Sequence, residues 1–412
     1  MKFIFINRYF HPDISATSQL LTDLAFELAK TRSIAVVTSR QRYDDASAAL
    51  PAAESVRGVD IRRVATTRFG RGNLLGRAFD YATFYLSAGA TLYRLARRGD
   101  VVVAKTDPPL ISIVAALVCA LRGARLVNWI QDLFPEVAEV LGMRVVRGAP
   151  AALLRRLRNR SLRAAAMNVV LSGDMARMVL VQGVAPDRVT VVPNWADGAQ
   201  VTPLDASASR LRGEWGLHER FVVCYSGNMG RVHEFDSLLE AARLIQAEEE
   251  RSVPAARTTF LFVGGGAQRL PLERRARELG LAHVVFKPYQ PRELLRDSLA
   301  AGDTHVVSLR PEVEGLVVPS KLYGILAAGR PVVFVGSNRG EIPDLLRDSG
   351  AGVAVRSGDA PALAGALAAL RADPRLRERM GREARRLFDE RFAFPISAGK
   401  FGEALDAAAL RD

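Results

Sequence analysis

The residues best suited to chemistry gather between Glu312 and Gly329. Two carboxylates, Glu312 and Glu314, follow an apolar run that is typical of a strand, and Gly315 comes directly after them. Carboxylate oxygens accept hydrogen bonds from hydroxyl groups, which cover the surface of a sugar. We therefore expect Glu312, Glu314 and Gly315 to line a pocket for a sugar-bearing ligand.

A short helix is expected directly after these acids. Pro319 and Ser320 are typical of a helix start, and Gly329 is typical of a helix end. Lys321 falls in the first turn, where a cation is unfavourable because that end of the helix dipole is positive. A diphosphate bound to the free amides would reverse this penalty, so Ser320, Lys321 and Tyr323 are expected in a diphosphate pocket. The alternative is an ordinary capped helix.

Two glycine loops follow other expected strands in the second half of the chain. Gly227 and Asn228 end an apolar strand, and Arg231 follows in the same loop. Glycine lets a backbone approach a phosphate closely, and a guanidinium offers several donors to it. The run 264–266 is a second close-approach site, and Tyr289 is suited to flank a nucleotide base. A plain turn is the alternative for each loop.

The first half of the chain has two candidate loops of its own. Ser15 and Ala16 lead into a helix whose N-terminal amides are suited to an anion, unless Thr17 or Ser18 is simply its cap. Asp132 and Glu136 follow a buried strand, where a carboxylate can orient or deprotonate an acceptor hydroxyl. Helix capping is the alternative for these two acids.

Several other chemistries lack the residues that they need. The five histidines are scattered, and no Asp-x-Asp pair occurs, so no divalent ion is implied at a diphosphate. The sequence contains no Gly-x-Ser-x-Gly nucleophile elbow and no P-loop lysine motif. The run 264–266 also lacks the further glycine of a dinucleotide fingerprint. We therefore expect neither a metal nor a cofactor.

The elements that must position these residues alternate between two kinds. Apolar, β-branched runs alternate with segments of helical period, such as 17–30, along almost the whole chain. This alternation predicts an α/β fold with doubly wound parallel sheets covered by helices on both faces. The expected strands are 3–7, 34–38, 59–64, 101–104, 125–130, 168–171, 189–192, 221–226, 259–263, 284–286, 304–309, 331–335 and 352–355.

The chain of 412 residues is too long for one ordinary core, and its pattern restarts at 221–226. The stretch from 193 to about 211 shows no periodicity, and we expect the linker there. We therefore predict two Rossmann-like domains, 1–200 and 201–385, and a C-terminal helix, 386–412, that packs back on the first domain. Open α/β sheets bind ligands at their strand ends, so a cleft between the two domains is the expected site.

Arginine gives the chain a formal net charge of +13 at pH 7. Seven arginines fall within 144–163, among leucine and alanine. Such a cluster is compatible with a solvated helix face or with a surface for anionic lipid. Aromatic residues are not interleaved with the arginines and no nucleic-acid module is present, so nucleic acid is not an expected partner.

Three further features bear on the compartment. Cys119 and Cys224 each fall in an apolar run, which favours two buried thiols in a reducing environment. The chain opens directly with a strand, without the pattern of a signal peptide. The longest apolar stretch, 108–121, is too short to span a bilayer, and we interpret it as a buried core helix. We expect a cytoplasmic protein, peripheral on the inner face of the cytoplasmic membrane.

These motifs resemble those of the group 1 glycosyltransferases (family 4, retaining, GT-B architecture). The resemblance covers essentially the whole chain. It is carried by Tyr9-Phe10-x-Pro12, Val192-Pro193-Asn194-x-x-Asp197, Tyr225-Ser226-Gly227-Asn228, Val263-Gly264-Gly265-Gly266, the block 319–331 and Gly340-Glu341-Ile342-Pro343. Segments 131–136 and 319–323 look typical of the bacterial branch that builds O-antigen, capsule and colanic-acid-type polysaccharides.

The resemblance implies a donor of the UDP- or GDP-sugar type and a glycan or lipid-linked acceptor. It implies a hexosyl- or N-acetylhexosaminyltransferase that retains configuration, in which the departing phosphate itself assists the acceptor hydroxyl. Catalysis is then electrostatic stabilisation of the leaving diphosphate. On this basis Asp132, Glu314, Lys321 and Arg231 are the expected catalytic residues, with the two cations supplying positive charge.

The chain departs from the family pattern at three places. The usual Arg and Lys after the first strand of the second domain align with Asn228 and His233. The family's second glutamate, which binds the ribose, falls near Gly324. The double glycine of the first loop is replaced by Ser15 and Ala16. A rearranged donor pocket is therefore expected.

Two other functions remain open from the sequence. A nucleotide-sugar epimerase on the same architecture needs acids and histidines for proton abstraction, and the loops here are poor in histidine. A non-catalytic sugar-nucleotide-binding protein is the second possibility, because Gly324 replaces the ribose-binding acid. Product analysis with donor alone distinguishes the epimerase from the transferase.

Overall fold

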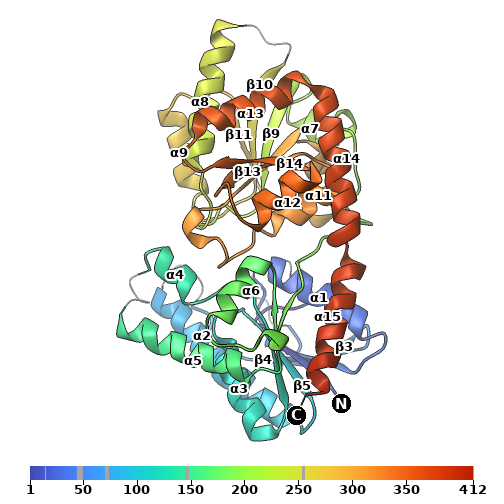
Figure 1. Ribbon diagram of the computed structural model, residues 1–412. Coiled ribbons are helices and arrows are strands. Elements are labelled where there is room, and N and C mark those ends of the chain that lie inside the picture. The colour runs from blue at the N-terminus through green and yellow to red at the C-terminus, as the bar shows by residue number, and fades with distance from the viewer. Residues whose placement is uncertain (14, 44–49, 70–73, 144–147, 253–255, 412) are drawn as a thin grey trace. The chain divides into compact units, whose positions relative to one another are not determined.

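The structure is a computed structural model that describes residues 1–13, 15–43, 50–69, 74–143, 148–252 and 256–411. The chain divides into two compact units (Figure 1). Unit 1 consists of Met1–Pro193, Gly315–Val318 and Ser397–Asp412, and unit 2 consists of Asn194–Glu314 and Pro319–Ile396. The segment 315–318 belongs to unit 1 because the carbonyl of Leu316 accepts from the amide of Leu133 at 2.9 Å.

Unit 1 is built on one mainly parallel sheet. In the described residues its strands run in the order β3-β4-β2-β1-β5-β6-β7-β8. Strand β5 reads VVVAK and is buried at every position, as expected for a strand covered on both faces. The strands are β1 (Phe3–Ile6), β2 (Ile34–Ser39), β3 (Ala53–Val56), β4 (Val59–Val64), β5 (Val101–Lys105), β6 (Arg125–Trp129), β7 (Met167–Val170) and β8 (Val189–Val191).

Helices cover both faces of the unit 1 sheet. Ile4 and Ile6 of β1 pack with helices α2 and α3, whereas Phe5 points to the opposite face and meets Phe401 of α15. Phe401 also contacts Trp129, at 4.7 Å between ring centroids. The helices are α1 (Ala16–Leu28), α2 (Leu74–Leu95), α3 (Ile111–Arg122), α4 (Glu136–Val140), α5 (Ala149–Ala164), α6 (Gly173–Leu180) and α15 (Phe394–Ala409).

Unit 2 contains a second sheet, which is parallel throughout its described strands. Their order is β11-β10-β9-β12-β13-β14. The strands are β9 (Arg220–Ser226), β10 (Arg257–Val263), β11 (Val284–Lys287), β12 (Thr304–Ser308), β13 (Val332–Gly336) and β14 (Gly352–Arg356). A core of aromatic and aliphatic side chains joins this sheet to α8 and α13.

The remaining helices of unit 2 connect these strands in the expected alternation. They are α7 (Arg210–Glu214), α8 (Asp236–Arg251), α9 (Arg269–Glu278), α10 (Leu295–Ala300), α11 (Lys321–Ala327), α12 (Glu341–Ser349), α13 (Ala360–Ala372) and α14 (Pro374–Arg391). The prediction of α/β architecture with parallel sheets is confirmed, and so is each predicted strand.

Two interpretations of the sequence differ from the structure. Strand β3 was not predicted, because it is an antiparallel edge strand whose short sequence, AESV, is half exposed and contains no apolar run. Helix α3 is not simply a buried core helix: it buries Ala115 and Val118 but leaves Leu117 and Leu121 exposed. Among the described helices, none is long and apolar enough to cross a membrane.

Candidate functional site

The strand order of unit 2 reverses between β9 and β12. The chain moves outward from β9 to β10 and β11, then returns to the other side of β9 with β12. Loops that leave the carboxyl ends of two such strands diverge, and ligands bind at this switch point in open α/β sheets. Tyr225 is the penultimate residue of β9 and Ser308 is the last residue of β12. These two residues therefore mark the expected binding edge of unit 2.

Lys321, the first residue of α11, reaches this edge. Its Nζ donates to the hydroxyl of Tyr225 at 2.8 Å and to Nε2 of His233 at 3.1 Å. Nδ1 of His233 lies 2.6 Å from the carbonyl oxygen of Ser308, which assigns the ring proton to Nδ1 and leaves Nε2 as an acceptor. The Tyr225 hydroxyl donates in turn to the carbonyl of Asn228 at 2.9 Å. Two of the three ammonium hydrogens are thus held, and the third remains for a ligand.

The environment of the ammonium group sets its charge. Burial, together with the positive charge of Lys321, lowers the pKa of His233 to about 3, so the imidazole is neutral. Burial also lowers the pKa of Lys321 to about 7, although its side chain remains partly exposed. An anion beside Nζ favours the charged form and raises this pKa again. Lys321 is therefore a cation whose charge depends on its ligand.

Two glycine loops leave space beside Lys321. Gly227 has a φ of +129°, and a Cβ placed on it would lie 3.4 Å from Cε of Lys321. A Cβ on Gly264 would lie 2.2 Å from the carbonyl oxygen of Gly227, a separation that backbone atoms cannot tolerate. The same Cβ would lie 3.3 Å from the ring of Tyr289, which is therefore next to this loop. Only glycine allows the loops after β9 and β10 to pack this closely.

The structure brings together four of the residues that the sequence singled out in this half of the chain. Gly227, Asn228, Tyr289 and Lys321 all belong to the loops described above. Glu314 lies nearby in the chain, after β12, and its Oε1 accepts from the amide of Ser337 at 2.7 Å. Ser320 precedes α11 as predicted, but its side chain makes no capping hydrogen bond.

Four predicted residues do not join this group. Arg231 is exposed and makes no hydrogen bond or ion pair with the described part of the chain. Glu312 is exposed and pairs with Arg310 at 3.5 Å. Tyr323 is buried against Phe392, because a residue two positions after Lys321 points to a different side of α11. Gly315 belongs to unit 1.

The residues that the sequence did not single out are Tyr225, His233 and Ser308. Tyr225 and His233 are separated from Lys321 by 96 and 88 residues, so their spacing gives no sign that they meet. The available signal is their position: both residues flank the first glycine loop, which is itself a candidate from the sequence. His233 was noted only as a departure from the family pattern.

Unit 1 has its own switch point, between β1 and β5. Asp107 follows β5, and its Oδ2 accepts from the hydroxyl of Thr17 at 3.2 Å. Asp132 follows β6 and is exposed. The protein atoms that surround its carboxyl group, and then the carboxylate of Asp107, raise the pKa of Asp132 to about 6. A carboxyl group with a raised pKa at a strand end is suited to accept a proton or hydrogen bond from a hydroxyl.

The other candidates of unit 1 have structural partners. The amide and hydroxyl of Ser15 donate to Oδ1 of Asp13 at 2.8 and 2.6 Å. Ala16 is the first residue of α1, and its cap residue is Ser15 instead of the expected Thr17 or Ser18. Glu136, expected to face an acceptor, forms an ion pair with Arg158 of α5. Of the two acids expected there, Asp132 alone remains a candidate.

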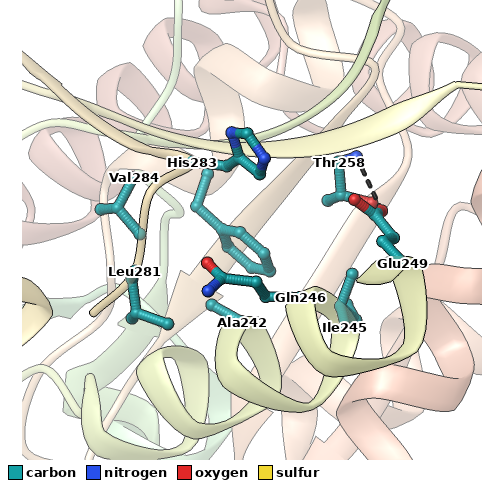
Figure 2. Close-up of a pocket in the computed structure, with 9 residues that line it drawn as sticks. Ala242, Ile245, Gln246, Glu249, Thr258, Leu281, His283 and Val284 are labelled. Carbon is teal, nitrogen blue, oxygen red and sulfur yellow. Dashed lines mark hydrogen bonds between the residues drawn. The ribbon is translucent and has the colours of Figure 1, made fainter. Parts of the chain in front are cut away.

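Figure 2 shows a pocket of unit 2 that lies elsewhere. Its walls come from α8 and from the first residues of β10 and β11, such as Thr258 and Val284. Oε1 of Glu249 accepts from the amide of Thr258 at 2.8 Å and pairs with Arg371 at 2.5 Å, which ties these elements together. Because it lies at the amino ends of the strands, this pocket is not at the binding edge.

Both halves of the chain match family models of glycosyltransferases. Residues 17–195 match the model of a glycosyl transferase 4-like domain, and residues 208–387 match that of glycosyl transferases group 1. The chain is 29% identical over 300 residues to "Probable glycosyltransferase WbjE" of Pseudomonas aeruginosa, covering 72% of each chain. It is 29% identical over 280 residues to "Putative colanic acid biosynthesis glycosyl transferase WcaI" of Escherichia coli K12, covering 62% of this chain and 66% of that one.

Solved structures share the fold over nearly the full length. HepE of Anabaena, in a crystal structure with UDP, has a TM-score of 0.71 at 16% identity, with 99% of this chain and 100% of that chain covered. WaaG, described as a glycosyltransferase involved in lipopolysaccharide biosynthesis, has a TM-score of 0.68 at 15% identity with the same coverage. With two glycosyltransferase family models matched in succession and a GT-B fold, the chain belongs to the group 1 glycosyltransferases.

Proposed function

We propose that this glycosyltransferase moves a sugar, with retention of configuration, from a nucleoside-diphosphate sugar to a glycan or lipid-linked acceptor. The observation that carries the proposal is the Lys321 ammonium, held at the β9–β12 edge by Tyr225 and His233 with one hydrogen left over. A diphosphate is an anion matched to such a donor. The crystal structures of HepE with UDP and with UDP-glucose support a UDP-type donor, although a GDP type fits equally.

The chemistry follows from the change in charge on the leaving group. As the glycosidic bond breaks, negative charge grows on the diphosphate, and a fixed cation stabilises that charge more than it stabilises the intact donor. The departing phosphate oxygen takes the proton of the acceptor hydroxyl, so no nucleophile from the protein is required. Gly227 and Gly264 let the backbone approach the phosphates, and Tyr289 flanks the base. Glu314 and Asn228 complete the donor residues.

The acceptor is assigned to unit 1, where Asp132 would accept a hydrogen bond from the attacking hydroxyl. In this proposal Lys321 neutralises the leaving diphosphate and no divalent cation is needed. The names of the relatives support a role in bacterial surface polysaccharide synthesis, since WcaI is described by colanic acid biosynthesis. The transferred group would be a hexose or an N-acetylhexosamine.

The proposed location is the cytoplasm, peripheral on the inner face of the cytoplasmic membrane. A lipid-linked acceptor would be presented there. The arginines of α5 support this location: Arg156, Arg160 and Arg163 are exposed. Arg144 and Arg147 of the same cluster lie outside the described residues.

The variant Lys321→Ala tests the proposal in a transfer assay with purified protein. We expect kcat to fall by about 10²–10³-fold, roughly 3–4 kcal/mol of transition-state stabilisation, as for a removed oxyanion donor. Lys30→Ala, which removes an exposed lysine of unit 1, is the matched control and should leave kcat unchanged. Unchanged turnover in Lys321→Ala would contradict the assignment. An isomerised donor formed without acceptor would indicate an epimerase instead.

A further inference from the structure

Helix α2 of unit 1 is apolar on the side that faces solvent. Its buried side packs on the sheet through Phe84, Ala88 and Leu92. The exposed side carries Phe79 and Leu86, which are 61% and 76% exposed and stand two turns apart. The residues of α2 that extend this exposed stripe are Ala82, Ala90 and Tyr93. A surface helix normally places polar residues there, and a helix that is apolar all round is usually covered on both sides.

Helices α3 and α5 continue the same kind of surface. Figure 1 shows α2, α3 and α5 along one side of the unit 1 sheet. A Cβ on Gly89 of α2 would lie 2.8 Å from the side chain of Val114 of α3, and Ser161 of α5 donates to the carbonyl of Ser112 of α3 at 3.1 Å. The helical face is defined here by the exposed side chains of Phe79, Leu86, Leu117, Leu121, Leu153 and Leu157.

Positive charge borders the helical face. Arg156 and Arg160 alternate with its leucines on α5, and Arg94 and Arg122 stand in the last turns of α2 and α3. Within the described residues of α2, α3 and α5 the one carboxylate is that of Asp80, which is buried. The face thus combines large apolar side chains with arginine and exposes no negative charge of its own helices.

We propose that the helical face lies in the surface of an anionic bilayer, with its apolar side chains below the headgroups and its arginines among them. Large exposed apolar side chains gathered on neighbouring helices are typical of interaction surfaces. Stable attachment to a membrane needs two signals, and here both are present on adjacent helices. A second copy of the chain is a poorer occupant, because pairing the same face would bring arginines together. The proposal deepens the membrane location proposed above and rests on it, but is independent of the transfer chemistry.

The two signals differ in their response to salt. Attraction between arginine and anionic lipid weakens as salt shortens the Debye length, which is about 8 Å at physiological ionic strength. Burial of apolar side chains does not weaken in this way. Each large apolar side chain removed from water contributes roughly one to two orders of magnitude to the partition coefficient. Binding through this face should therefore fall with salt without being abolished.

Vesicle flotation with the full chain tests the inference. The vesicles are phosphatidylglycerol with phosphatidylethanolamine, compared with pure phosphatidylcholine. The variant Leu86→Asp/Leu117→Asp should lose at least about tenfold in partition to the anionic vesicles, because two side chains that enter the bilayer become charged. The matched control is Leu270→Asp, because Leu270 belongs to unit 2 and its exposed fraction, 74%, is similar to that of Leu86. This control variant should bind the vesicles as the parent chain does.

Three outcomes would overturn the inference. The first is that Leu86→Asp/Leu117→Asp binds the anionic vesicles as well as the parent chain does. The second is that the parent chain binds phosphatidylcholine vesicles equally well. The third is that light scattering shows a dimeric parent chain and a monomeric variant that still binds vesicles. Unfolding is monitored by circular dichroism, and UDP binding by the same variant reports on unit 2. Loss of vesicle binding with intact UDP binding separates this surface from the proposed transfer site.

Discussion

Lys321 is held by two uncharged groups, and this decides how it responds to a ligand. Tyr225 and His233 accept hydrogen bonds from Nζ but bring no negative charge to it. A carboxylate in either place would neutralise the ammonium and compete with a phosphate. Burial without a counter-charge instead lowers the pKa of Lys321 to about 7. Lys321 therefore becomes fully protonated when an anionic ligand binds beside Nζ.

Nucleoside-diphosphate binding should therefore depend on pH. The free protein holds Lys321 with a pKa near 7, and the bound diphosphate raises that pKa. Below pH 7 the ammonium is already charged and this group adds no pH dependence. Above pH 7 binding must take up a proton, so affinity should fall by up to about tenfold per pH unit. Calorimetric titration with UDP between pH 7 and 9 measures the slope.

The variant Lys321→Arg provides the control for this titration. A guanidinium stays protonated over the whole range, so its affinity should be nearly independent of pH. The same slope in the parent chain and in Lys321→Arg would show that another group takes up the proton.

Asp132 should make the rate of transfer increase with pH, at a lower pH than the loss of nucleotide affinity that Lys321 causes. Its pKa is raised to about 6 by the surrounding protein atoms and by Asp107, and the ionised carboxylate accepts a hydrogen bond from the acceptor hydroxyl more strongly than the protonated acid does. The rate should therefore rise as pH increases through 6 and level off above it. Asp132→Asn should remove this rise and lower kcat by about 10²-fold. If the rate instead falls as pH increases through 6, Asp132 acts as an acid.

The sequence predicted part of the site and misplaced the rest for identifiable reasons. Lys321 was found because a cation in a first helical turn is locally unfavourable. Tyr225 and His233 were missed because their role depends on contacts across about 90 residues of chain. Tyr323 was included through proximity in sequence, whereas the turn of α11 directs it into the core. Local rules identify candidate residues, and tertiary contacts decide which of them meet.

At the scale of elements, burial decides what can be predicted. Strands such as β5 and β13 are buried on both faces, and their uninterrupted apolar runs identify them from sequence. Edge strand β3 has no such run and was missed. Helix α3 shows the converse. Its apolar sequence predicts burial, but the sequence does not show that one side of the helix is uncovered. The exposed side of α3 became visible only in the structure.

Helix α15 should contribute strongly to the stability of unit 1. Phe401 is fully buried, between Phe5 and Trp129, on the face of the sheet opposite to α2 and α3. Phe401→Ala removes most of a buried aromatic ring and should lower the free energy of unfolding of unit 1 by about 3–5 kcal/mol. Urea unfolding followed by tryptophan fluorescence measures the change. Leu410→Ala is the control, because Leu410 is 86% exposed and should change stability by less than about 0.5 kcal/mol.

On the scale of the whole molecule, the chain consists of two units with separate cores and separate binding edges. Unit 1 has its switch point between β1 and β5, and unit 2 has its own between β9 and β12. The sequence predicts domains at 1–200 and 201–385, and the structure first divides the chain after Pro193. The short return of 315–318 to unit 1 could not be anticipated, because it depends on pairing with residues near Leu133.

Because the proposed donor residues belong to unit 2, a nucleotide should stabilise unit 2 and leave unit 1 unchanged. Binding to the native state raises stability by mass action, by about 2.7 kcal/mol when the free ligand is at 100 times its Kd. The tryptophans allow each unit to be followed, because Trp129 belongs to unit 1, whereas Trp195 and Trp215 belong to unit 2. In Trp129→Phe, the remaining tryptophans report on unit 2. In thermal unfolding with a panel of nucleoside diphosphates, the nucleotide with the matching base alone should raise the unfolding temperature of this variant. In Trp195→Phe/Trp215→Phe the remaining signal should not move, and an equal shift in both variants would place the nucleotide on both units.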